Sequence, residues 1–345
     1  MTISVRTCLT VCVAFVVLGV GALASPASSG YHLIKTVPIG AAPGSGEYFD
    51  YVTVDPAARR VYIAHGSEVK VLDADNFSVV GSITGFKRCH GVALVPDLGK
   101  GFISDGDGEQ VAVFDIKTLK VTNQIKTQPD TDSITYDPAS KLIFTFNGDS
   151  KNSSVIDPSK ETVVKTIDMG GAVEQPIVDG KGMLYDNNEE TNEVVSVDTH
   201  ALAVKARWPV KPAGEPVAIS MDTEHRRIFS GGRGPAMLVM MDADNGKVLQ
   251  SFPIGAGADA NVYDPGTGFV LTSTRAGILH IFHEDSPDKL SPVEEIKTEY
   301  GAKTMGLDSK THNLFLVTSD FGPADAKGKR SAVKGTARER RSGGR

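Results

Sequence analysis

The sequence predicts an all-β fold, a seven-bladed β-propeller closed by an N-terminal strand, with a disordered basic C-terminal tail. Three observations predict it: a strand–turn–strand pattern recurs seven times, each repeat has room for four short strands, and helical periodicity is nearly absent. The turns begin at Asp55, Pro96, Asp137, Asp179, Asp222, Asp264 and Asp308, so the intervals are 41, 41, 42, 43, 42 and 44 residues. All-β domains of about this length commonly form one unit.

Each repeat contains the same four elements, which the first repeat illustrates. A strand at 51–54 precedes the turn, a second at 60–64 follows it, a third at 69–73 ends in Asp73, and a fourth at 78–83 follows a polar turn. Alternating β-branched residues bounded by Asp, Asn, Gly and Pro indicate strands and turns. We interpret the repeated Asp after the third strand as a turn residue that accepts backbone N–H bonds.

The propeller domain spans 31–321, and we expect a strand from its N-terminal end to close the ring. Residues 32–39 resemble the fourth strands of the other repeats, and we expect them to pair into the seventh repeat. That repeat supplies inner strands at 305–307 and 313–318. Residues 322–345 contain too little apolar surface to offset the entropy of ordering, so we expect a disordered tail and an incomplete seventh blade.

The first 24 residues resemble a signal peptide. Arg6 precedes an apolar run at 8–23, and Ala22 and Ala24 fit the small-x-small cleavage pattern. A membrane anchor is the alternative, although the run is short for a span. We therefore expect a periplasmic or secreted protein with no transmembrane span in the mature chain. Only Cys89 would remain after cleavage, which excludes an internal disulfide.

Charge is distributed unevenly along the chain. The net charge of −6 combines +6 in residues 321–345 with −12 in the rest. An acidic body argues against nucleic-acid binding by the propeller, because phosphate contacts need a basic face. We expect a monomer whose partner is a small ligand or a protein, neither of which the sequence identifies.

The candidate site lies where the first strands begin, around the mouth of the central channel. Four acidic residues occupy the position five residues before the turn in different repeats, and a histidine and a further glutamate lie close to that position in two others. The predicted ligand-binding residues are Asp50, His90, Asp132, Glu174, Glu215 and Asp259.

Converging carboxylates repel one another unless protonation, water or a cation relieves the repulsion. Three interpretations stay open: a water-filled channel that binds nothing tightly, recognition of a positively charged ligand or side chain, and a cation site. Ca²⁺ would be the natural ion for oxygen ligands, although the sequence commits to no metal.

Several motifs resemble the bacterial YncE-like, YVTN-repeat propellers. They are Asp50-Tyr51-Val52-Thr53-Val54-Asp55-Pro56, Val71-Leu72-Asp73-Ala74-Asp75, Asp179-Gly180-Lys181-Gly182 and Leu316-Val317-Thr318-Ser319-Asp320-Phe321. The resemblance covers roughly 31–321 and implies an exported propeller of undefined activity. That family is similar in architecture to haem-d1 domains and seven-bladed lactonases.

The leading functional hypothesis is a binding or scaffold module that uses the channel mouth. The alternative is a lactonase-like hydrolase, in which His90 and an acidic residue activate water beside a cation. A haem-d1-like redox domain is a third possibility, but no axial ligands can be placed. Binding leads because the sequence assembles no nucleophile, base and oxyanion donors.

Overall fold

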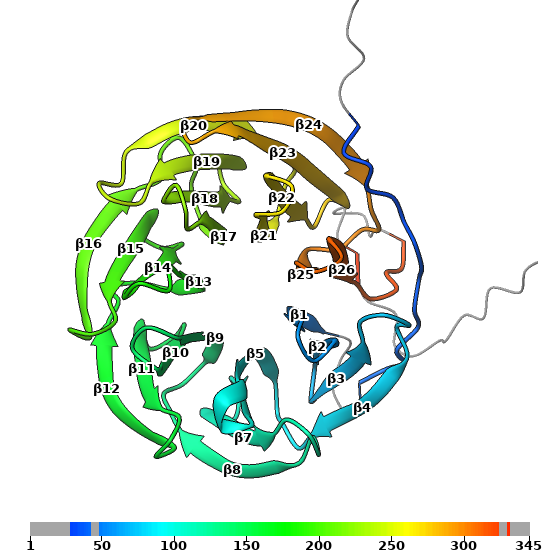
Figure 1. Ribbon diagram of the computed structural model, residues 1–345, viewed down its shortest axis with the longest axis vertical. Helices are drawn as coiled ribbons and strands as arrows, with labels where there is room; N and C mark the ends of the chain where they lie inside the picture. Colours follow the sequence, from blue (N-terminus) through cyan, green and yellow to red (C-terminus); the bar gives the residue numbers. More distant parts are fainter. Residues whose placement is uncertain (1–27, 43–47, 324–329, 332–345) are drawn as a thin grey trace, which may run out of the picture.

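The computed structural model describes residues 28–42, 48–323 and 330–331, which form a ring of antiparallel sheets (Figure 1). Within them, six sheets have four strands in chain order and one sheet has two. We number the sheets 1 to 7 along the chain. Sheet 1 contains β1 (Phe49–Asp55), β2 (Arg60–His65), β3 (Glu68–Asp73) and β4 (Val79–Thr84). Sheet 2 contains β5 (Cys89–Val95), β6 (Lys100–Asp105), β7 (Gln110–Asp115) and β8 (Val121–Lys126). Sheet 3 contains β9 (Thr131–Asp137), β10 (Leu142–Asn147), β11 (Asn152–Asp157) and β12 (Thr162–Asp168). Sheet 4 contains β13 (Val173–Val178), β14 (Met183–Asn188), β15 (Glu193–Asp198) and β16 (Ala203–Pro209). Sheet 5 contains β17 (Pro216–Asp222), β18 (Arg227–Gly232), β19 (Met237–Asp242) and β20 (Val248–Pro253). Sheet 6 contains β21 (Ala258–Asp264), β22 (Phe269–Thr274), β23 (Ile278–Ser286) and β24 (Lys289–Lys297), and sheet 7 contains β25 (Thr304–Asp308) and β26 (Asn313–Val317). A 3-10 turn, η1 (Pro96–Leu98), joins β5 to β6.

The first strand of every sheet faces the centre of the ring, and the fourth strands form its rim (Figure 1). The predicted order of four strands per repeat is therefore confirmed for sheets 1 to 6. The two inner strands predicted for the seventh repeat are also confirmed, as β25 and β26.

The turn between the first and second strands is built from an Asx turn and a left-handed residue. Asp55 Oδ1 accepts the backbone N–H groups of Ala57 at 3.0 Å and Ala58 at 2.9 Å. Arg59, immediately before β2, has a φ of 56°. The same left-handed position recurs before the second strand of the other sheets, at Gly99, Lys141, Gly182, Arg226, Gly268 and His312.

The aspartates after the third strands serve as turn residues, as predicted. Asp115 Oδ1 accepts the backbone N–H of Thr118 at 2.7 Å and that of Lys117 at 3.1 Å. These bonds favour the charged carboxylate, and with the Thr118 hydroxyl they lower the pKa of Asp115.

The hydrophobic core fills the space between neighbouring sheets. Tyr62 of sheet 1 packs against Phe114 of sheet 2, and both side chains are fully buried. A Cβ at Gly101 would lie 2.1 Å from the Phe114 ring, so only glycine fits beneath this aromatic residue. The sheets are thus fixed by packing rather than by covalent links.

The prediction of an N-terminal strand at 32–39 is wrong, because residues 28–42 contain no strand. A fourth strand needs a third strand as its hydrogen-bond partner, and sheet 7 ends at β26 within the described residues. The segment instead runs along the rim from sheet 6 to sheet 1 (Figure 1). Ser29 donates two bonds to Glu294 in β24, and the Lys35 ammonium donates to the Asn76 carbonyl oxygen after β3.

The predicted signal peptide and nearly all of the predicted basic tail lie outside the described residues. In the part of the chain that is described, no helix has the length and apolarity needed to cross a membrane.

Candidate functional site

Three of the predicted residues meet at the channel mouth. Asp50, His90 and Asp132 lie at the beginning of β1, β5 and β9, so equal register in neighbouring sheets brings them together. His90 Nδ1 lies 2.6 Å from Asp50 Oδ2 and 3.0 Å from Asp132 Oδ1. The hydroxyl of Tyr48 donates to the same Asp50 oxygen at 2.7 Å.

His90 is the cation of this group, which we call the mouth triad (Asp50, His90 and Asp132). Burial disfavours its protonation, but the carboxylates of Asp132 and Asp50 outweigh that effect and raise its pKa to about 10. The triad therefore carries an imidazolium between two carboxylates at neutral pH. Nε2 of the same ring is buried and has no hydrogen-bond partner among the described residues.

Tyr51 belongs to the site although the sequence analysis did not select it. Burial raises the pKa of its phenol well above the usual value, and Asp132, Glu174, Asp50 and Asp259 raise it further. Four carboxylates from four sheets therefore act on one hydroxyl at the channel mouth. Its place next to Asp50 at the start of β1 could have pointed to Tyr51. Successive side chains of a strand point to opposite faces, however, so a residue next to Asp50 is expected to point away from the Asp50 side.

The other side of the mouth is largely neutralised. Asp259 forms ion pairs with Arg233 and Lys303, and Arg233 also lies 3.5 Å from Glu189. Glu174 is different, because burial and the nearby Asp132 and Glu189 raise its pKa well above the usual value. In the predicted acidic ring, the carboxylate of Asp259 is thus neutralised by two cationic side chains, whereas Glu174 has further carboxylates beside it.

Glu215 does not join the other predicted residues. It is solvent-exposed in the loop before β17, with a φ of 49°, and its backbone N–H donates to Asn192 Oδ1 at 2.6 Å. Its position two residues earlier than the common register places it outside the mouth.

Below the mouth, the inner strands enclose a cavity of about 470 Å³. Its wall includes the Tyr51 ring and polar groups such as Ser220, whose hydroxyl donates to Asn261 Oδ1 at 2.6 Å. The channel is therefore a mixed polar and apolar space, large enough for a small ligand.

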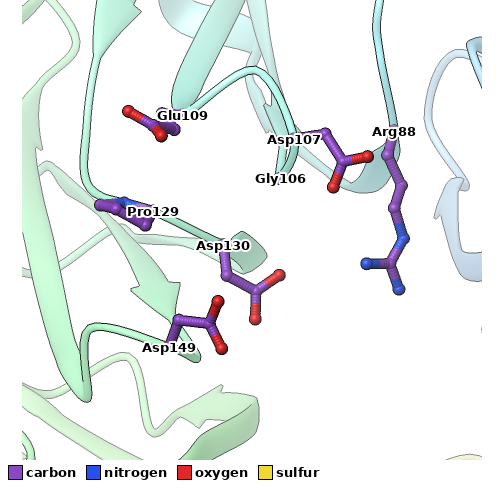
Figure 2. A pocket seen from close by; sticks show the side chains of 7 residues that line it. All are labelled: Arg88, Gly106, Asp107, Glu109, Pro129, Asp130 and Asp149. Carbon is purple, nitrogen blue, oxygen red and sulfur yellow. The ribbon is translucent and has the colours of Figure 1, made fainter.

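An acidic cleft of about 340 Å³ opens beside the triad, between the loops of sheets 2 and 3 (Figure 2). Four carboxylates and one guanidinium surround it; its lining residues are Arg88, Gly106, Asp107, Glu109, Pro129, Asp130 and Asp149. Figure 2 shows the side chains of Asp130 and Asp149 next to each other, with Arg88 across the opening. These residues lie in loops, where sequence spacing did not reveal them.

Gly106 connects the cleft to the triad. A Cβ on this residue would lie 2.7 Å from His90 Nε2 and 3.5 Å from Asp130 Oδ1. The absence of a side chain leaves space between the unpartnered imidazole nitrogen and the cleft carboxylate. Burial and the neighbouring Asp132 raise the pKa of Asp130.

The triad could also hold a metal ion, because one donor atom from each residue lies within 4.8 Å of the others. One imidazole and two carboxylates form a poor Ca²⁺ site, since Ca²⁺ takes six to eight oxygen ligands. The same donor set suits Zn²⁺ or a similar ion better. His90 Nδ1, however, is already hydrogen-bonded to Asp50 and forms an ion pair with Asp132.

Comparisons with known proteins identify the class of fold. No protein-family model and no curated protein sequence matches the chain. Solved structures are similar to it: hydrazine synthase from Kuenenia stuttgartiensis has 14% identity and a TM-score of 0.68, with 84% of this chain and 99% of that chain covered. The WD40 repeats of RRP9 have 10% identity and a TM-score of 0.70, with coverage of 80% and 91%.

A chain in the mitotic checkpoint complex has 14% identity and a TM-score of 0.70, with coverage of 89% of this chain and 95% of that chain. Identities this low establish the fold and nothing further. The chain is a β-propeller.

Proposed function

We propose that this protein is a binding module that recognises a cationic group, on a small ligand or on a protein, at the acidic mouth of its channel. The observation that carries the proposal is the cleft of Figure 2, which is lined by four acids and a single cation, Arg88; the acids are Asp107, Glu109, Asp130 and Asp149. A positively charged ligand would relieve the repulsion among these carboxylates and would replace water in a partly buried site.

The finer identity of the fold is part of the same proposal. We count the two-stranded sheet 7 as an incomplete seventh blade and assign the chain to the YncE-like, YVTN-repeat propellers. The regular spacing of the turns supports this assignment. Arg6 followed by the apolar run at 8–23 supports export to the periplasm or the medium.

A titration with spermidine tests cation recognition, with a lysine-rich peptide as a second probe. We expect saturable binding by calorimetry that weakens at least tenfold in the double variant Asp130→Asn/Asp149→Asn and declines with added salt. Asp97→Asn is the matched control, since Asp97 is an exposed acid of sheet 2 in the turn at the opposite end. Equal binding by the double variant and the wild type would contradict the proposal.

A lactonase-like hydrolase is the second candidate, favoured only by the compact donor set of the mouth triad. It requires a metal ion that displaces the His90 hydrogen bonds and activates water. Elemental analysis combined with a lactone screen tests it. A stoichiometric metal that disappears in Asp132→Ala, together with lactone hydrolysis, would support it; a metal-free protein inactive on lactones would exclude it.

A further inference from the structure

A second cluster of possible metal ligands lies at the opposite end of the sheets from the mouth. Asp222 ends β17, His225 follows in the turn, and Glu284 comes from β23 of the next sheet. The first strands run from the mouth to these turns, so the cluster is remote from the mouth triad. One donor atom of each residue lies within 4.8 Å of the other two.

Three of the other turns show one way in which this place is filled. In them, the turn aspartate pairs with the left-handed residue that precedes the second strand of the next sheet. These pairs are Asp179 with Arg226 at 3.0 Å, Asp264 with His312 at 2.7 Å and Asp308 with Arg59 at 2.7 Å. For Asp222 the corresponding residue of the next sheet is Gly268, which has no side chain to offer.

Glu284 also departs from the repeat. Its backbone N–H donates to the Gly268 carbonyl at 2.9 Å, as those of Ala74 and Ala243 donate to the equivalent carbonyls in their sheets. A carboxylate therefore stands where sheets 1 and 5 carry the methyl group of an alanine. Both of its oxygens are shielded from solvent and accept no hydrogen bond of regular geometry within the described structure, although the neighbouring Tyr263 phenol lowers the pKa of this carboxyl group.

Two carboxylates thus converge where a cation side chain is missing. Asp222 is 3% exposed, and His225 Nδ1 lies 2.5 Å from its Oδ2. Burial and the nearby Asp222 raise the pKa of Glu284 to about 7. Asp222 is thus paired with His225 and accepts backbone N–H groups of its turn, whereas the half-buried Glu284 is not needed for the turn, and burying its carboxylate there is costly.

We propose that Asp222, His225 and Glu284 bind a divalent transition-metal ion of the zinc type. One imidazole nitrogen and two carboxylate oxygens are ligands that such ions accept, and three protein ligands leave a fourth position for water. The His225 side chain is 43% exposed, so an ion can reach the site from solvent. The ion would supply the positive charge that Arg226, His312 or Arg59 supplies at the other turns.

Titration of the metal-free protein with Zn²⁺ tests this site. We expect wild-type protein to bind zinc and to melt at a higher temperature with it. Affinity at this site should fall at least tenfold in Glu284→Gln and in His225→Gln. Glu284→Gln keeps the side-chain shape and removes a buried charge, and His225 lies in an exposed turn, so at least one variant should fold.

Two controls separate this site from other histidine–carboxylate pairs. His312→Gln removes the imidazole from a turn that has no third acid, and Asp132→Asn alters the mouth triad at its most exposed member; both should retain this zinc site. The proposal is overturned if wild-type protein binds no zinc, or if Glu284→Gln and His225→Gln bind it as the wild type does. Loss of all zinc binding in a folded Asp132→Asn variant alone would overturn it as well, because the metal would then belong to the mouth.

Discussion

Replacement of His90 by glutamine should destabilise the propeller strongly. The side chain is 1% exposed, and its Nδ1 is within 3.0 Å of carboxylate oxygens of both Asp50 and Asp132. Without the imidazolium, the buried carboxylate of Asp50 and the partly buried carboxylate of Asp132 lose their cation, a change that costs about 3–5 kcal/mol in buried ion pairs. The rise of the His90 pKa from 6.5 to about 10 corresponds to roughly 5 kcal/mol in favour of the charged form, which is the same order.

Urea unfolding followed by Trp208 fluorescence and circular dichroism measures this loss. Trp208 is the only tryptophan of the chain and packs against Tyr185 of its own sheet, so it reports on the folded ring. The exposed His32 provides the control, and His32→Gln should leave the unfolding midpoint unchanged. Adding Asp50→Asn to His90→Gln should recover part of the loss, because it removes one of the orphaned charges.

The pH dependence has a definite sign. Because the pKa of His90 is raised in the folded state, its stabilising effect is fully present below pH 6.5 and is lost as pH rises through about 10. Wild-type stability should therefore fall across this alkaline range more steeply than that of His90→Gln. A loss below about 1 kcal/mol, the size of a surface ion pair, or an identical pH slope in the variant would refute the reasoning.

Three further predictions concern single positions. Asp186 is fully buried and its pKa lies well above the usual value, so the stability that its protonation provides is lost as pH rises above about 4. The Asp186→Asn variant should therefore match or exceed the urea midpoint of the wild type at pH 8 and lose that advantage near pH 4. A lower midpoint of the variant at pH 8 would show that the fold needs the carboxylate. Gly246→Ala should lower the free energy of unfolding by about 1–3 kcal/mol and shift the tryptophan emission, because its Cβ would lie 2.0 Å from Trp208 at a φ of +74°. Gly85→Ala is the control: its Cβ would meet open space, so the emission should stay unchanged. Gly106→Ala should weaken spermidine binding in calorimetry by filling the space behind the cleft, and undiminished affinity would show that this space is not used.

The repeat, the strand order and the turns could be predicted from the amino-acid sequence. These features are local: alternation sets which face of a strand is buried, and Asp115 accepts backbone N–H groups only three residues away. The similar positions of Asp50, His90 and Asp132 at the start of their strands also predicted that they come together at the mouth, and they do. Equal spacing in successive repeats is sufficient for that.

The neutralisation of particular charges and the lack of a third strand in sheet 7 could not be predicted in this way, because they depend on contacts between sheets. Asp259 pairs with Arg233 and Lys303 from neighbouring sheets, while Glu284 lies beside Asp222 and His225 next to a turn that ends in Gly268 and offers no side chain. Residues 32–39 have a strand pattern, but they form no strand because sheet 7 offers them no third strand to pair with. Pairing and burial depend on side chains distant in sequence, so spacing within one repeat does not predict them.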